Sequence, residues 1–440
     1  MFMTKKAYLL TIPVALLMIL GLLVYQTVNA APAEPEETTS TVLWENGKSL
    51  TNSNVPQSAF QPDIATAPDG KTVLVSFLNE TSGSKTNPYY VRSTDNGKTW
   101  SNPAQIYTNN GTEALFVNIT FDVASGGHAV WVEDNLSLWY GKESQWSGNT
   151  SGSIHSIPVG PGNLIESPKI ISNGTDKLHV VWGQQIAVDG DIYHMRSADG
   201  GNTWNTATVI ANDNGALSLA PSLAADSNGV LHVVWETNIS ASPLQAEIFY
   251  TQSSDDGTTW STPITISQKV NLSTRVFAQP KIIADGSSVY VAFENHPNVS
   301  QQKPYFAVCS SGCTNLNNWT AGEASPQVYS VHGSDPTFLK AQPALLGGCA
   351  ITLFSGITGG STEQIWENSN CNNWNSATSV SGVDAVLGGN YRAVRPSVAT
   401  HNNWWLYLAF ERKDGGSGRS DIYFVRNIPA LYLPVILRSP

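Results

Sequence analysis

The sequence predicts an all-β protein built from repeated four-stranded antiparallel units, and three observations lead to this prediction. The 440-residue chain has 10% aromatic residues, 36 glycines and only 13% charged residues, which is typical of short strands joined by many turns. An eight-residue pattern occurs three times in the chain. A longer pattern occurs seven times, at a spacing of roughly 50–60 residues that is typical of repeat architectures.

The eight-residue pattern is Ser-x-Asp-x-Gly-x-Thr-Trp, and each copy follows a short run of aromatic and β-branched residues. This position predicts a β-hairpin turn in which glycine adopts a positive φ. The Asp and Ser side chains should bond nearby backbone N–H groups, and the Trp ring should pack between sheets. The defining residues of the three copies are Asp95, Gly97, Trp100, Asp199, Gly201, Trp204, Asp255, Gly257 and Trp260.

The longer pattern is a proline, a short apolar run, a turn and a second apolar run that ends in an aromatic residue. Pro168, for example, leads to residues 178–182 (LHVVW). Each copy is interpreted as four strands, A to D, with the eight-residue pattern at the C–D turn. We therefore predict a seven-bladed β-propeller, because radial repetition of such sheets protects their edges. A six-bladed propeller with one irregular unit is the alternative. The copies begin at Pro62, Asn118, Pro168, Pro221, Pro280, Pro343 and Pro396.

The eight-residue pattern resembles the Asp-box (BNR) repeat of sialidases and related β-propellers. The resemblance implies that a ligand binds at the mouth of the central channel, on the face opposite the Asp boxes. Sialidases have six blades, three arginines for the substrate carboxylate, a Tyr–Glu nucleophile pair and an Asp acid/base. Here Gln61 occupies the position of the first arginine, Arg395-Pro396 is the one Arg-Pro pair, and the catalytic Asp has no counterpart that we can place.

The N-terminus predicts an exported protein. Lys5 and Lys6 precede an apolar run over residues 7–25, and residues 28–30 (VNA) resemble a cleavage site. An uncleaved membrane anchor is the alternative, since the run is long enough to span a bilayer. The predicted segments are a signal peptide or anchor (1–30), a disordered linker (31–40), the propeller (41–428) and a C-terminal tail (429–440).

The last copy of the repeat lacks an obvious strand D, so residues 41–44 (TVLW) are expected to complete its sheet. Four cysteines suit an oxidising compartment. No Cys-x-x-Cys is present and the nearest histidines lack ligand spacing, which favours disulfides over a metal site. The cysteines fall at turns of two neighbouring copies that lack the Asp box. The preferred pairs are Cys309–Cys313 and Cys349–Cys371, although four cysteines allow three connectivities.

Candidate site residues come from the loops at the predicted channel mouth. A glutamate follows the aromatic end of strand B in several copies, and polar residues precede strand A, with Lys340 nearby. The candidate catalytic residues are Tyr391, Glu236, Glu294 and Glu411. The candidate ligand-binding residues are Arg275, Arg392, Arg395, Gln61, Gln279 and Gln342.

The favoured function is the non-catalytic binding of a glycan or a partner protein by an exported monomer, secreted or tethered at the outer face of a membrane. The alternatives are a sialidase-like exo-glycoside hydrolase and a structural surface protein. The net charge of −11, without basic clusters after the N-terminus, argues against a nucleic-acid partner. No cofactor is predicted, and no metal, because Asp189 and Asp191 supply too few oxygens for calcium.

Overall fold

The structure of the protein is a computed structural model that describes residues 42–429, apart from short internal gaps of which 52–56, 147–153, 160–163 and 332–337 are the longest. The predicted signal segment, the linker and the tail beyond Pro429 lie outside the described residues. In the described part of the chain, no helix is long and apolar enough to cross a membrane.

The described strands form five separate four-stranded sheets and one eight-stranded sheet. In the eight-stranded sheet, two groups of antiparallel strands are joined by one parallel contact between Gly190 and Leu217. We name the groups repeats 1 to 7, after the sequence copies that form them.

Repeat 1 contains β2 (Ala59–Thr66), β3 (Val73–Glu80), β4 (Thr86–Ser93) and β5 (Ala104–Gln105), and repeat 2 contains β6 (Ala114–Phe121), β7 (Gly127–Glu133), β8 (Ser137–Lys142) and β9 (His155–Ile157). Repeat 3 contains β10 (Leu164–Ser172), β11 (Leu178–Ile186), β12 (Asp189–Ser197) and β13 (Thr208–Ala211), and repeat 4 contains β14 (Leu217–Ala225), β15 (Leu231–Ala241), β16 (Leu244–Ser253) and β17 (Ile264–Thr265).

The remaining groups follow the same plan. Repeat 5 contains β18 (Phe277–Asp285), β19 (Ser288–Asn295), β20 (Lys303–Cys309) and β21 (Trp319–Glu323), and repeat 6 contains β22 (Gln342–Leu346), β23 (Cys349–Gly356), β24 (Gln364–Ser369) and β25 (Thr378–Ser379). Repeat 7 contains β26 (Tyr391–His401), β27 (Trp405–Asp414), β28 (Ser420–Arg426) and the N-terminal strand β1 (Lys48–Ser49). The short helices are η2 (Glu143–Gln145), η3 (Ile266–Lys269), η4 (Leu316–Asn318), η5 (Asn370–Asn372) and α2 (Ser381–Asp384).

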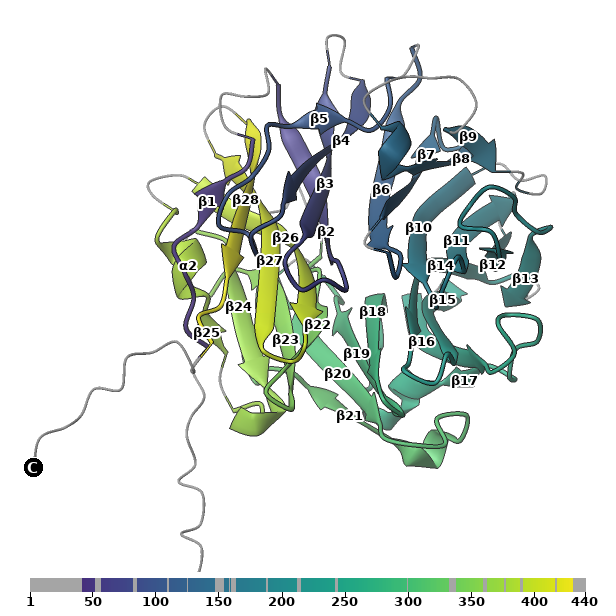
Figure 1. Cartoon of the computed structure of the whole chain (residues 1–440). Helices are drawn as coiled ribbons and strands as arrows, with labels where there is room; N and C mark the ends of the chain where they lie inside the picture. The colour runs from purple at the N-terminus through teal and green to yellow at the C-terminus, as the bar shows by residue number, and fades with distance from the viewer. Residues whose placement is uncertain are drawn as a thin grey trace, which may run out of the picture. The chain divides into compact units, whose positions relative to one another are not determined.

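The first strand of each repeat lies against the first strand of the next. β2 contacts β6, β6 contacts β10, and the contacts continue through β14, β18 and β22 to β26, which contacts β2 again. Figure 1 shows the sheets arranged around a centre with these strands innermost. The second strands, such as β7, are buried along their length because a sheet lies on each side of them. Three buried tryptophans, Trp131, Trp182 and Trp235, fill equivalent positions between sheets.

The N-terminal segment completes repeat 7, but with a different register from the predicted one. Strand β1 pairs with β28 through Lys48 and Phe424, whereas Trp44 makes one isolated bridge with Asn427. The Trp44 side chain is buried among residues of repeats 6 and 7, and its indole N–H donates to Glu367 at 3.1 Å. Because this ring packs into the core, the chain joins the sheet further on, at β1.

The Asp boxes form the predicted turns, and they also join neighbouring repeats. In the second box, the Asp199 carboxylate accepts from the Thr203 N–H at 2.8 Å, and the Gly201 N–H donates to the Ser197 hydroxyl at 2.8 Å. Gly201 lies directly on the Tyr140 ring of repeat 2, where a Cβ atom would collide with the ring. The first box likewise lies on Phe424 of repeat 7, and the third on His194 of repeat 3. Each box is therefore a turn and a joint between two sheets.

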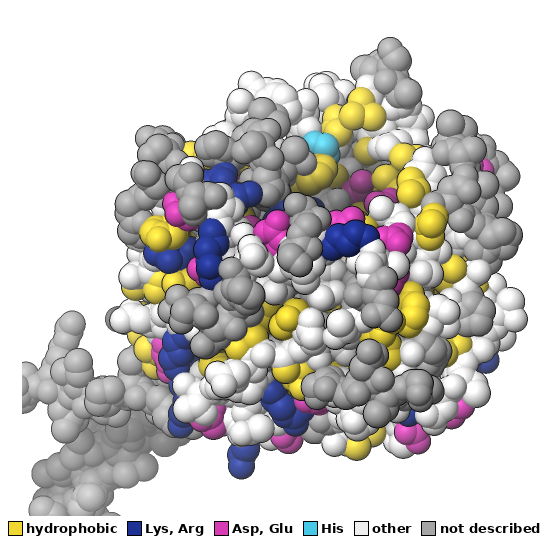
Figure 2. All heavy atoms as spheres, turned by 90° about the horizontal axis from the view of Figure 1, so that it is seen from above, with side chains coloured by type: hydrophobic (Ala, Val, Ile, Leu, Met, Phe, Trp, Pro, Cys, Tyr) yellow, Lys and Arg dark blue, Asp and Glu magenta, His cyan; other side chains and the backbone are white. Residues whose placement is uncertain are grey.

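Charged side chains of both signs are mixed on the outer surface. In the view from above (Figure 2), Lys and Arg side chains lie near Asp and Glu side chains, and uncharged side chains surround these small groups. Opposite charges on this face therefore offset one another.

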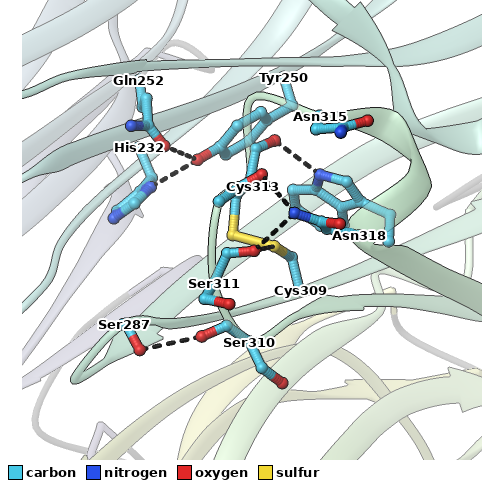
Figure 3. Close-up of a disulfide and its surroundings, with 12 residues drawn as sticks. His232, Tyr250, Gln252, Ser287, Cys309, Ser310, Ser311, Cys313, Asn315 and Asn318 are labelled. Atoms are coloured by element: carbon cyan, nitrogen blue, oxygen red, sulfur yellow. Dashed lines mark hydrogen bonds between the residues drawn. A yellow bond between two sulfur atoms is a disulfide. The ribbon is translucent and has the colours of Figure 1, made fainter.

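Both predicted disulfides, Cys309–Cys313 and Cys349–Cys371, are present. The first occupies the turn where repeat 5 lacks an Asp box, beside Tyr250 of repeat 4 (Figure 3). Trp319 donates its indole N–H to the Cys313 carbonyl at 2.8 Å and packs edge-on against Tyr250 at 4.8 Å between ring centroids. The Asp-box Trp204 packs against Tyr140 in the same way, at 5.1 Å. The disulfide loop thus takes the place of an Asp box.

Candidate functional site

A cavity of about 450 Å³ lies among the innermost strands of the repeats. Its lining combines amide side chains, prolines that lie within the innermost strands rather than at their starts, and the aromatic rings of Phe116 and Phe338. Four cationic side chains also line it, namely Lys169, Lys281, Lys340 and Arg395, together with one carboxylate, Asp63. The cavity is thus a polar site with aromatic surface and an excess of positive charge, in a chain whose net charge is −11. Such an excess attracts anions.

A β-bulge shapes the innermost strand in six of the repeats. In repeat 1, for example, the pairing of β2 with β3 shifts between Phe60 and Asp63, and Gln61 adopts a φ of 52°. Each repeat has one non-glycine residue in this left-handed region at the equivalent place, and we call these the bulge residues. They are Gln61, Phe116, Ser167, Ala220, Gln279, Lys340 and Arg395, with φ between 49° and 55°.

The bulge residues deliver side chains to the cavity. All of them except Ala220 line it, and next to Ala220 it is Pro221 that does so. A positive φ costs a non-glycine residue of order 1–3 kcal/mol and persists only where the surrounding structure imposes it. Bulges commonly re-aim side chains next to functional sites. The repeated strained conformation therefore marks this end of the strands as the candidate site.

We call the residue two positions after each bulge residue a belt residue. The belt residues are Asp63, Asn118, Lys169, Ser222, Lys281, Gln342 and Ser397. In four repeats the belt side chain accepts a hydrogen bond from a backbone N–H of the following innermost strand. The pairs are Asp63 with Ile119 at 3.0 Å, Asn118 with Ile170 at 2.9 Å, Ser222 with Ile282 at 3.3 Å and Ser397 with Ile64 at 3.3 Å. These side chains hold neighbouring strands together.

Three belt positions break this rule. Gln342 in repeat 6 instead donates to the Lys340 carbonyl of its own repeat at 3.3 Å. The other two are lysines, which have no acceptor atom. Lys169 in repeat 3 lies 3.8 Å from the Asp63 carboxylate. The Lys281 side chain in repeat 5 makes no hydrogen bond or ion pair with the described residues. Burial and the neighbouring charges of Lys340 and Lys169 lower the pKa of Lys281 to about 8. Its ammonium group therefore remains protonated at neutral pH, and the nearby carboxyl groups of Asp63 and Glu236 favour this charged form.

The predicted glutamates hold the innermost strands in place. Glu236 accepts a hydrogen bond from the Gln279 N–H at 2.6 Å, and Glu294 accepts one from the Lys340 N–H at 3.2 Å. Each carboxyl thus fixes the bulge residue of the following repeat. Burial raises the pKa of Glu236, and raises that of Glu294 to about 8. Glu411 differs, since it bonds Ser420 at 2.6 Å and Arg395 at 2.7 Å within its own repeat.

The predicted ligand-binding residues divide into two groups. Gln61, Gln279, Gln342 and Arg395 line the cavity. The other two lie elsewhere, since Arg275 pairs with Glu247 at 3.0 Å and buried Arg392 lies 3.8 Å from Glu363. The catalytic candidate Tyr391 is covered by the Arg412 guanidinium, which lies 3.3 Å from the centroid of its ring. The structure therefore does not bring the three arginines together in the cavity.

Sequence reasoning missed several residues of the cavity lining, among them Lys169, Lys281, Phe116 and Phe338. The two lysines directly follow the proline of strand A, where they look like ordinary strand residues. An alignment of the repeats at that proline would have shown lysine in the column where repeats 1, 4 and 7 have Asp63, Ser222 and Ser397. Phe116 and Phe338 had no such signal, because neither precedes a proline.

Comparison with known proteins agrees with this architecture. Residues 186–354 match the family model of the BNR repeat-like domain. This segment contains the second and third Asp boxes and the Cys309–Cys313 loop. The search of curated protein sequences found no match.

Solved structures share the fold at low sequence identity. A protein of unknown function from Dyadobacter fermentans DSM 18053 is 15% identical, with a TM-score of 0.50 over 88% of this chain and 99% of that one. The phage phi92 endosialidase is 15% identical, with a TM-score of 0.51 over 91% and 71% of the two chains. An ulvan lyase of polysaccharide lyase family PL25, bound to -[GlcA(1-4)Rha3S]-, is 9% identical, with a TM-score of 0.53 over 84% and 94%.

At these identities the likeness concerns the fold alone. The Asp-box turns, the four-stranded antiparallel sheets and the matched BNR segment agree with one another. Together they confirm the resemblance seen in the sequence: residues 186–354 match the BNR repeat-like domain, and the described chain is an all-β, propeller-like array of four-stranded antiparallel sheets with Asp-box turns.

Proposed function

We propose that this protein is an exported seven-bladed propeller that binds a glycan, without turning it over, in the cavity among its innermost strands. The observation that carries the proposal is the set of bulge residues, which present amide, hydroxyl, aromatic and cationic side chains to one cavity. Sugar rings are bound by such combinations of hydrogen-bonding groups and apolar surface. Two proteins of similar fold are named for glycans, the phi92 endosialidase and the ulvan lyase.

The count of seven blades is supported by the contacts among the innermost strands, which lead from β2 through β26 and back to β2. A six-bladed ring would need one repeat to lie outside this sequence of contacts. Export is supported by the two disulfides, which suit an oxidising compartment.

Binding is favoured over hydrolysis by the positions of the candidate catalytic groups. Glu236 and Glu294 are engaged by backbone N–H groups, and Tyr391 lies outside the cavity lining beneath Arg412. A sialidase-like mechanism needs a Tyr–Glu pair and an acid at one reacting centre. A purely structural role is disfavoured because it offers no reason for strained residues to surround an open cavity.

A glycan array followed by titration calorimetry tests the proposal. We expect the protein to bind one class of glycan and to leave a fluorogenic sialoside intact. The variant Gln342→Ala should weaken binding, whereas Trp404→Ala, in the A–B turn of repeat 7 on the Asp-box side, should not. Turnover of the sialoside would establish the hydrolase instead. Absence of binding across the array would contradict a glycan-binding role.

A further inference from the structure

We propose that the glycan is acidic and that the ammonium group of Lys281 binds its carboxylate or sulfate. This inference rests on the proposed glycan-binding function and names the chemical class of its ligand. It places the anion at a belt lysine rather than at an arginine cluster.

The first step concerns the belt residues that do not accept a backbone hydrogen bond from the next repeat. Asp63, Asn118, Ser222 and Ser397 each accept a backbone hydrogen bond from the next repeat, which is a structural role. Lysine at this position forgoes that bond. Residues that depart from the pattern shared by the equivalent positions of other repeats are often functional. Gln342 also lacks that bond, but only Lys169 and Lys281 have no acceptor atom with which to make it. The belt therefore identifies these two lysines as side chains that its structural role does not require.

The second step separates the two lysines. Lys169 lies within ion-pair distance of Asp63, at 3.8 Å. Lys281 also lies near Asp63 and near Glu236, which favour its charged form. Both carboxylates are already engaged, however, Asp63 by the Ile119 N–H and Glu236 by the Gln279 N–H. In the described part of the chain, the Lys281 side chain has no hydrogen bond or ion pair, so its donors remain available to a ligand.

The third step concerns the other cations of the cavity. Lys340 donates to the Gln279 side-chain oxygen at 2.7 Å and lies over the Phe338 ring at 4.9 Å. Arg395 pairs with Glu411 at 2.7 Å. These contacts fix both groups near the cavity, where their charges add to the attraction for an anion. An ammonium group is a compact charge with three donors, so it suits a carboxylate and a sulfate alike.

The two belt lysines offer a matched pair of variants. Titration calorimetry would compare three probes of equal length: cellohexaose, a hexameric oligogalacturonide that carries carboxylates, and a carrageenan hexasaccharide that carries sulfates. We expect at least one acidic probe to bind more tightly than cellohexaose. Lys281→Met should then weaken its binding by about tenfold or more, as for the loss of a charged hydrogen bond. Lys169→Met should weaken binding less, and Lys281→Arg should restore much of it.

The outcomes separate the two proposals. If none of the probes or arrayed glycans binds, the glycan-binding function itself fails. If cellohexaose binds as tightly as both acidic probes, glycan binding stands and the acidic class is overturned. Equal losses in Lys281→Met and Lys169→Met would overturn the assignment to Lys281. The acidic probe that loses affinity in Lys281→Met identifies the anion as a carboxylate or a sulfate.

Discussion

The Asp-box turns and the bulges of the innermost strands both recur from repeat to repeat. The turns recur in their side chains, whereas the bulges recur in their backbone conformation. The Asp boxes repeat their side chains: Asp, Gly and Trp return in each copy, and each glycine lies on a ring of the preceding repeat. The bulges repeat a backbone conformation, with φ near 50°, while their side chains differ widely, from Ala220 to Phe116 to Arg395.

This difference separates architecture from recognition. A joint that performs the same task in every repeat requires the same atoms each time, so its side chains recur. A binding surface requires one backbone arrangement that presents different groups to an asymmetric ligand. Repeated geometry with varied side chains therefore points to the ligand site, and repeated side chains point to the framework. The following changes test that distinction, beginning with the largest expected loss of stability.

The largest loss is expected from Gly201→Ala in the second Asp box. A Cβ atom would collide with the Tyr140 ring, and the residue has a φ of 83° that disfavours alanine. Overpacking together with this strain should lower the free energy of unfolding by about 3 kcal/mol. Chemical denaturation measures the loss. The control is Gly174→Ala, which has a φ of 92° but no neighbouring atom within 4 Å. Equal losses in the two variants would show that the joint with Tyr140 contributes nothing.

A smaller loss is expected from Asp63→Ala at the belt. This change removes the acceptor of the Ile119 N–H and of the Asn118 amide, both in repeat 2. Leaving a partly buried backbone donor unpaired should cost about 2 kcal/mol. Asp63→Asn retains an acceptor oxygen and should recover part of the loss. Wild-type stability in Asp63→Ala would show that the belt does not hold the repeats together.

Acid should destabilise the joint between repeats 3 and 4. Burial lowers the pKa of His179 to about 4 and that of His194 to about 3, because the two rings stack in the core. An unfolded histidine titrates near 6.5, so the unfolded state binds protons first. The stabilising contribution is complete above pH 6.5 and declines as the pH falls towards 4.

The neighbouring repeats supply the control for this pH effect. Repeats 2 and 4 have Tyr140 and Tyr250 at the position of His194, each bonded to a strand-B histidine. His194→Tyr gives repeat 3 the same pair, and it should reduce the loss of thermal stability between pH 6.5 and 4. Identical pH profiles for variant and wild type would assign the acid sensitivity to other groups.

The framework was predictable from the sequence because it repeats side chains. The Asp boxes and most of the prolines of strand A recur at fixed places in the copies, and the two disulfides lie at turns of two copies that lack the Asp box. The register of β1 was not predictable, since it depends on the burial of Trp44 between two repeats.

The site was predictable only in part. Gln61, Gln279 and Arg395 precede a strand-A proline, so their position in the cavity lining follows from the repeat. Arg392 lies in the same connection as Arg395, yet it is buried near Glu363, because the bulge in β26 changes which residues face the cavity. Side-chain direction at a bulge depends on backbone conformation, which the residue types there do not reveal.

The smallest change in stability is expected from Gln61→Gly, which should nevertheless have a large effect on binding. Glycine adopts a φ of 52° without strain, so the release of strain offsets the greater freedom of the unfolded chain. The melting temperature should stay within the range of a neutral surface substitution. The amide that Gln61 presents to the cavity is lost, so affinity for the glycan should fall. Calorimetry and thermal denaturation on one sample measure both quantities. A marked loss of stability with unchanged affinity would mean that the bulge residues belong to the framework, and it would remove the distinction between the two kinds of repeat.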